Sequence, residues 1–264
     1  MPLFKDIEAF KNVDPALQWA IFIVGCLIVV MAAVSAVVSI WLAVKYVVYN
    51  RTENKAGING EQTARKILDD NGLGHIRVSV VGSLMFGNSY SHFFKKVRLR
   101  RWTVKKNSIS SMAMGAQKSS LAILDKEGDK DMKTRIFLTP FIYFGPLMFL
   151  PILIVGVALD IIFFNFSGVA TIVSAALGLL FYVASFVMSL MVLKTEVKAQ
   201  NKALEILEKD NLATAEEREM MKSLFKLYNI QYVNDLILEF LELILRVLML
   251  VAKVQNSSSS SSSD

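Results

Sequence analysis

The chain has 264 residues, of which 54% are hydrophobic and 20% are charged, and its formal net charge is +6. Three stretches of 24 residues or longer contain no charged residue: 16–44, 136–159 and 161–193. Because about 20 apolar residues in a helix cross a bilayer core, these stretches predict a mainly α, polytopic membrane protein with three transmembrane helices. A secreted, disulfide-stapled or freely soluble module is excluded, and the lone Cys26 permits no intrachain disulfide.

The predicted organisation follows these stretches. The segments are an external amino-terminal segment (1–15), transmembrane helix 1 (16–48), a basic cytoplasmic region (49–135), transmembrane helix 2 (136–166), transmembrane helix 3 (169–193), cytoplasmic helices (194–227), an amphipathic or membrane-embedded helix (228–254) and a disordered serine-rich tail (255–264). The first stretch is longer than a signal-peptide core and no basic run precedes it, so we expect a retained helix. Pro140, Pro146 and Pro151 predict that the second span is kinked.

The charge distribution predicts the orientation. Residues 51–135 carry 17 Lys and Arg against 8 Asp and Glu. Positive charge next to a membrane helix favours the cytoplasmic side. We therefore expect a multi-pass protein of the plasma membrane, with its soluble parts in the cytoplasm.

The last apolar block, 228–254, contains four charged residues. Asp235, Glu239, Glu242 and Arg246 fall on one helical stripe, and four central charges outweigh the apolar residues around them. The block is expected to lie in the interface or against the other spans, with the stripe toward water or protein. An intramembrane proton or ion relay is the alternative interpretation.

Short signals predict a small α+β cytoplasmic region. Asn59 is placed to cap a helix that ends at Asn71-Gly72. The β-branched runs 76–81 and 97–104 predict strands, and residues 108–124 predict a further helix. Another helix is expected over 196–209, and residues 214–217 (TAEE) are a capping box for the next.

The basic run 95–106 is the main candidate for interactions. It contains seven Lys and Arg residues, no acid and one Trp. A solvated edge strand is the favoured interpretation, a patch facing anionic lipid headgroups the alternative, and nucleic acid is not expected. The candidate interaction residues are Tyr90, Lys95, Lys96, Arg98, Arg100, Arg101 and Trp102.

Five motifs in order resemble a known family. Residues 60–73 (GEQTARKILDDNGL) are similar to a G-x-E-x-A-R-x-I-L-D-x-N-G-L helix, and Tyr90 with residues 96–99 (KVRL) to a D-H-Y-D-P segment followed by a K-x-V-R-L strand. Ser108-Ile109 with residues 114–116 (MGA), residues 196–204 (EVKAQNKAL) and Tyr232-Val233 continue the order. Together they resemble the neutral zinc metallopeptidases of bacterial membranes, and the resemblance implies a zincin-like helix between the membrane regions.

The zinc motif of that family is altered here. The resemblance implies an H-E-x-x-H helix in which two His hold Zn²⁺ and the Glu is the general base, with a later acidic residue as third ligand. The corresponding positions are Gln117, Lys118 and Leu121, and the third-ligand position is Glu196. An amide is a poor zinc ligand, an isobutyl group is none, and an ammonium repels the metal. We therefore expect no catalytic residue, no metal and no cofactor.

These observations predict a catalytically inactive relative, a pseudo-peptidase, that binds a partner protein or peptide at the former cleft of residues 85–124 with Glu196. One alternative is an active metallopeptidase rebuilt from His75, His92 and Glu196. A second is a transporter component that uses Asp160 and the charged stripe. Small residues in the first span, at 32, 35, 36 and 39, permit close helix contact within the bundle or in a homo-oligomer.

Overall fold

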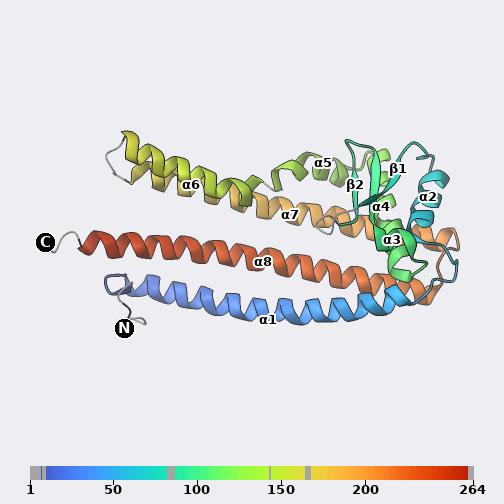
Figure 1. Cartoon of the computed structure of the whole chain (residues 1–264), viewed down its shortest axis with the longest axis horizontal. Helices are drawn as coiled ribbons and strands as arrows, with labels where there is room; N and C mark the ends of the chain where they lie inside the picture. The colour runs from blue at the N-terminus through green and yellow to red at the C-terminus, as the bar shows by residue number, and fades with distance from the viewer. Residues whose placement is uncertain (1–6, 8–9, 82–86, 143, 164–167, 261–264) are drawn as a thin grey trace. The chain divides into compact units, whose positions relative to one another are not determined.

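The computed structural model describes residues 7, 10–81, 87–142, 144–163 and 168–260 (Figure 1). The chain divides into two compact units, which are considered separately. The central unit comprises Trp41–Asn229, and the terminal unit comprises Met1–Ile40 with Ile230–Asp264. The elements are α1 (Pro15–Arg51), α2 (Gly60–Asp70), β1 (Arg77–Val81), β2 (Ser89–Ser91), β3 (Lys96–Arg100), α3 (Arg101–Lys105), α4 (Ile109–Lys126), α5 (Lys130–Ile142), α6 (Phe144–Phe163), α7 (Val169–Lys209) and α8 (Ala215–Ser260).

Helix α2 begins and ends where its local signals predict. The Asn59 side chain accepts a hydrogen bond from the Gln62 N–H at 2.8 Å, and Gln62 Oε1 accepts one from the Asn59 N–H at 2.9 Å. This reciprocal pair satisfies two of the N–H groups that a helix start leaves unpaired. Gly72 follows the helix at φ +65°, a conformation that glycine adopts without strain.

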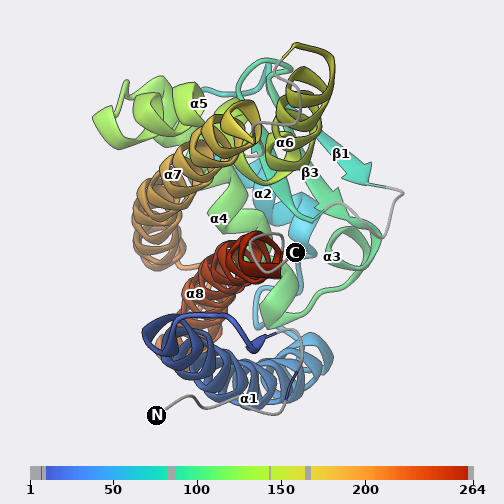
Figure 2. The same ribbon diagram turned by 90° about the vertical axis from the view of Figure 1, so that its left-hand side faces the viewer.

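The three strands form one mixed sheet in the order β1-β3-β2. β1 runs parallel to β3, and β2 runs antiparallel to it. The interpretation of residues 95–106 as an edge strand is therefore wrong, because β3 is paired on both sides. The predicted strand 97–104 also ends early, since the chain turns into α3 at Arg101 (Figure 2).

Helix α4 is the centre of the central unit. Every residue from Ile109 to Leu124 is buried, and the helix packs against both α2 and α7. Its closest contact is with α2, where a Cβ added to Gly115 would overlap the carbonyl oxygen of Gly60. The two backbones thus approach each other at a pair of glycines, which holds α4 in a fixed register against α2.

In the described part of the chain, two candidate membrane spans are found where the sequence predicted three transmembrane helices. Among the residues that the structure describes, α1 and α7 are long and apolar enough to cross a membrane. The predicted second span, 136–166, is divided between α5 and α6, and its apolar helical part is Leu147–Phe163. Proline cannot continue the hydrogen bonding of a helix, and this stretch contains three prolines, of which Pro151 lies inside α6.

Helices α6 and α7 lie side by side in both views (Figures 1 and 2). Gly156 faces Ser174 and Gly178 faces Phe149, so the two helices are antiparallel. Asp160 is buried and accepts hydrogen bonds from the N–H of Ala170 at 3.0 Å and of Thr171 at 2.6 Å. It therefore caps the start of α7.

Helix α8 is continuous, where the sequence predicted a helical region ending at 227 and a separate helix over 228–254. It starts at the predicted capping box, in which Glu217 accepts from the Thr214 N–H at 2.7 Å and the Thr214 hydroxyl accepts from the Glu217 N–H at 3.2 Å. Its helical backbone extends to Ser260, into the tail expected to be disordered from 255, and residues 261–264 lie outside the described part.

The terminal unit pairs the first part of α1 with the second part of α8. The Ser35 hydroxyl donates to Asp235 Oδ1 at 3.0 Å, and Gln231 Nε2 donates to the same oxygen at 2.6 Å. The predicted stripe of Asp235, Glu239, Glu242 and Arg246 is exposed.

We predict that Gly115→Ala destabilises the central unit by several kcal/mol, about 2 or more, because the new methyl group must displace backbone atoms of Gly60. Thermal unfolding of the full chain in detergent measures the loss. Gly25→Ala is the matched control, since a Cβ at this helical glycine meets nothing within 4 Å. An equal effect of the two substitutions would contradict the close approach of α2 and α4.

Candidate functional site

The structure brings the degenerate zinc-motif positions to Glu196. Gln117 and Lys118 project from α4, and Glu196 lies on α7. Gln117 Nε2 donates to Glu196 Oε2 at 2.8 Å, and Lys118 Nζ donates to the same oxygen at 2.8 Å. Three residues that the sequence resemblance placed at one site therefore do meet, although 78 positions or more separate Glu196 from the α4 pair.

A fourth residue, Arg135 of α5, completes this Glu196 cluster. Its guanidinium donates to Glu196 Oε1 at 2.6 Å, so each carboxylate oxygen faces a cation. The side chains are largely buried, with 11% of Lys118, 15% of Arg135 and 18% of Glu196 exposed. Away from water, charge-assisted hydrogen bonds are strong and an unpaired charge is costly. The cluster therefore ties α4, α5 and α7 together.

The Glu196 cluster does not fit a zinc ion. Zinc is held in proteins by imidazole, thiolate or carboxylate ligands. Gln117 presents its amide N–H₂ to the carboxylate, and Leu121, one turn further along α4, is fully buried and apolar. The one carboxylate already accepts from two cations. Among the described residues, no three His, Cys, Asp or Glu side chains are grouped so that they would hold a metal ion.

The two histidines are not brought to Glu196. His92 Nδ1 lies 2.7 Å from Asp125 Oδ2, at the end of α4, and His75 is exposed. The site proposed as an enzyme alternative, built from His75, His92 and Glu196, is therefore not assembled among these residues.

Asp125 is the centre of a second polar cluster. Its Oδ2 accepts a hydrogen bond from the Tyr90 hydroxyl at 2.6 Å and lies 3.3 Å from Lys95 Nζ. Burial alone would raise the pKa of the Asp125 carboxyl, but the hydrogen bonds from Tyr90 and His92 and the charge of Lys95 outweigh it and hold the pKa below its usual 3.8. Burial and the neighbouring carboxylate raise the pKa of the Tyr90 phenol, which remains protonated and donates.

The predicted interaction residues fall into separate environments. Tyr90 belongs to the hydrophobic core, and its hydroxyl donates a hydrogen bond to Asp125. Lys95 also contacts Asp125. Lys96, Arg98 and Arg100 alternate with the buried Val97 and Leu99 along β3, and therefore share the outer face of the sheet. Arg101 and Trp102 are exposed on α3.

Two of the polar residues at these sites, Arg135 and Asp125, were not predicted. Arg135 lies at the boundary of an apolar stretch, where its charge suggested only membrane orientation. Asp125 lies at the end of a helix, where no motif marks it. For Asp125, the one sequence signal was that it is the first acid after a run, 93–124, that contains none.

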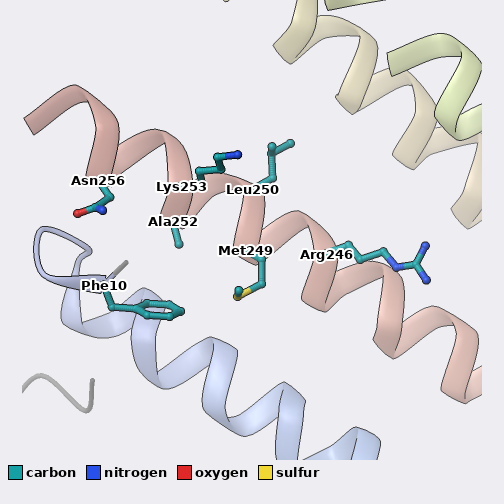
Figure 3. A pocket seen from close by; sticks show the side chains of 7 residues that line it. All are labelled: Phe10, Arg246, Met249, Leu250, Ala252, Lys253 and Asn256. Carbon is teal, nitrogen blue, oxygen red and sulfur yellow. The ribbon is translucent and has the colours of Figure 1, made fainter. Parts of the chain in front are cut away.

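A groove in the terminal unit is lined by one residue of the charged stripe, Arg246, and by none of the residues predicted for metal binding or interaction (Figure 3). It has a volume of about 550 Å³. Its lining combines apolar side chains of α8 and Phe10 with two cations, and consists of Phe10, Arg246, Met249, Leu250, Ala252, Lys253 and Asn256.

Comparison with known proteins gives one match. The model of a protein family described as "Putative neutral zinc metallopeptidase" matches residues 24–252, which is most of the chain. Searches of curated proteins and of solved structures returned no match.

We predict that Arg135→Met destabilises the central unit by about 2 kcal/mol, because Glu196 Oε1 loses its charged hydrogen-bond donor at a largely buried position while Lys118 continues to pair with Oε2. Chemical or thermal unfolding in detergent measures the change. Lys222→Met is the control, since the Lys222–Glu219 pair is exposed on both sides and is expected to contribute less than about 1 kcal/mol. Equal effects would show that the Glu196 cluster is not buried as described.

A second prediction concerns the pH dependence of Asp125. Folding lowers the pKa of the Asp125 carboxyl. The stability that this carboxylate contributes is therefore complete above its pKa in the unfolded chain, and is lost as the pH falls through its pKa in the folded chain. Asp125→Asn should therefore lower the melting temperature at neutral pH, and this difference should shrink between about pH 5 and about pH 3. A difference that stays constant over that range would contradict the prediction.

Proposed function

Because the chain belongs to the neutral zinc metallopeptidase family, we propose that it is a non-catalytic member in which an ion-pair cluster has replaced the metal centre. It acts as a membrane-anchored binding protein. The observation that carries this proposal is the state of Glu196, whose two oxygens accept hydrogen bonds from Lys118, Gln117 and Arg135.

The chemistry of Lys118 opposes peptidase activity in two ways. A metallopeptidase needs a carboxylate at this position to accept a proton from a metal-bound water. An ammonium that donates to Glu196 at 2.8 Å cannot accept that proton, and its charge repels a cation at the same place. In this cluster, the side chains of Lys118 and Arg135 thus neutralise the charge of Glu196.

Burial of the cluster also bears on where a partner binds. Gln117, Lys118 and Leu121 are all buried, so the former cleft offers these residues little contact with another molecule. Binding is therefore assigned to surfaces outside the Glu196 cluster.

The two alternatives have less support. A rebuilt metal site would need His92 to leave Asp125 and Glu196 to leave two cations. A transporter would need Asp160 to bind or relay ions, whereas this carboxylate accepts hydrogen bonds from the start of α7.

Membrane anchoring is proposed for α1 and for the antiparallel pair of α6 and α7. Helices α1 and α7 are long and apolar enough to cross a bilayer, and most of the apolar part of α1 is exposed. Because Glu196 of α7 contacts Lys118 of α4, the chain must return to the side on which residues 51–135 lie, and the apolar part of α6, Leu147–Phe163, is therefore proposed to enter the bilayer beside α7. The surplus of positive charge in residues 51–135 favours placing this region on the cytoplasmic side of a bacterial plasma membrane.

Zinc content tests the proposal directly. We predict that the full chain, purified in detergent and dialysed against EDTA and then against zinc, retains no stoichiometric zinc and cleaves no peptide. The triple variant Gln117→His/Lys118→Glu/Leu121→His should bind about one zinc per chain, because it provides two imidazoles one helical turn apart beside Glu196. Elemental analysis measures both.

The matched control is Gln117→His/Lys118→Glu, which lacks the second imidazole and should bind zinc far more weakly. One tightly held zinc in the unmodified chain, or peptide hydrolysis that EDTA stops, would overturn the proposal whether or not the triple variant folds.

A further inference from the structure

The outer face of the sheet is strongly basic. In the strand register, Arg77 of β1 lies beside Lys96 of β3, and Ser79 lies beside Arg98. Residues directly paired across strands share one face of the sheet. β3 is followed by α3, which carries Arg101 and Lys105, and Lys106 comes directly after it. We call the six cations Arg77, Lys96, Arg98, Arg101, Lys105 and Lys106 the basic face; the first three share one face of the sheet, and the other three lie on or directly after α3, the next element of the chain.

Exposed aromatic rings lie among these cations. The Phe94 ring is 68% exposed, with Lys96 Nζ 4.9 Å and Arg98 Cζ 5.6 Å from its centre. The Trp102 ring is 64% exposed, with Lys106 Nζ at 5.4 Å. Phe93, in the turn between β2 and β3, is 74% exposed. Burying such rings in an apolar environment is favourable, so they are a source of binding energy that charge alone does not supply.

Few acids lie near the basic face in the sequence. Residues 93–124 contain no Asp or Glu. Asp125, the first acid after them, contacts Tyr90, His92 and Lys95. A surface with this composition is complementary to closely spaced phosphate groups.

The basic face is connected to the end of α1 within the central unit. The N–H of Asn54 donates to the carbonyl of Asn107 at 2.9 Å, and the N–H of Ile109 donates to the carbonyl of Thr52 at 3.1 Å. Residues 107–109 directly follow α3, and residues 52–54 directly follow α1, whose uncharged stretch ends at residue 44. Residues 101–106 therefore directly precede a segment that is hydrogen-bonded to residues 52–54, which lie eight to ten positions past the end of that uncharged stretch.

We propose that the basic face binds the anionic phospholipid headgroups of the bilayer that α1 crosses, with Phe93, Phe94 and Trp102 in the interfacial layer. Lys and Arg next to an anionic leaflet are attracted to it, and aromatic rings are enriched at this depth. Single-stranded nucleic acid also binds cations and exposed rings. The connection to the end of α1 favours lipid. This inference rests on the proposed crossing of the membrane by α1, and is independent of the metal question.

Fluorescence quenching in nanodiscs tests the proposal. The full chain carrying Cys26→Ser and Phe93→Cys, labelled at the new thiol, is placed in nanodiscs that contain spin-labelled lipid, with phosphatidylcholine alone or with about 30% phosphatidylserine. We expect about threefold stronger quenching with phosphatidylserine, and loss of this increase in Lys96→Glu/Arg98→Glu. Lys222→Glu/Lys226→Glu on α8 carries the same charge change at exposed positions and should behave as the parent chain.

Other outcomes overturn the proposal. Equal quenching in both nanodiscs, or unchanged quenching in the charge-reversed variant, excludes the lipid contact. A second outcome is that a single-stranded RNA binds the chain in nanodiscs of phosphatidylcholine alone and also abolishes the stronger quenching seen with phosphatidylserine. That outcome assigns the basic face to nucleic acid. If Lys96→Glu/Arg98→Glu fails to fold, Lys96→Gln/Arg98→Gln must show the same loss in smaller degree. If the parent chain does not co-elute with nanodiscs of phosphatidylcholine alone, the proposed crossing of the membrane by α1 is contradicted. Co-elution without the phosphatidylserine effect contradicts only the headgroup contact of the basic face.

Discussion

The pairing of the Glu196 carboxylate with two cations is the constraint on which the central unit depends. A carboxylate with this little exposure is stable only with full compensation, and Lys118 and Arg135 provide it from two other helices. The same function would be served in a metallopeptidase by the metal ion and its ligands. The cluster thus accounts for two properties at once, the packing of α4, α5 and α7 and the absence of a suitable set of zinc ligands.

Other contacts of the central unit do not depend on the Glu196 cluster. The close contact of Gly60 and Gly115 sets the register of α2 against α4. Ion pairs from Lys194, Lys198 and Lys202 of α7 to Asp131, Asp129 and Glu127 hold the junction of α4 and α5. None of these contacts involves Gln117, Lys118 or Leu121, so they are compatible with the proposal that a non-catalytic member keeps the packing of its family.

Sequence patterns predicted the features that depend on neighbouring residues. The caps at Asn59 and Thr214, and the start of α4 at Ser108, were predicted because each signal and its partner lie within four positions. The pairing of β3 on both sides was not predicted, because strand order depends on where a distant strand lies. Arg135 was missed for the same reason, since it meets Glu196 from 61 positions away. The second span was overestimated because counting apolar residues ignored the interruption by proline.

The most direct test of the central claim is a double-mutant cycle between Lys118 and Glu196, using Lys118→Met and Glu196→Gln, measured by unfolding in EDTA and again with added zinc. The account predicts a favourable coupling of about 2 kcal/mol or more that is the same in both conditions, because the interaction is between the two side chains. A coupling near zero, or one that appears only with zinc present, would contradict it.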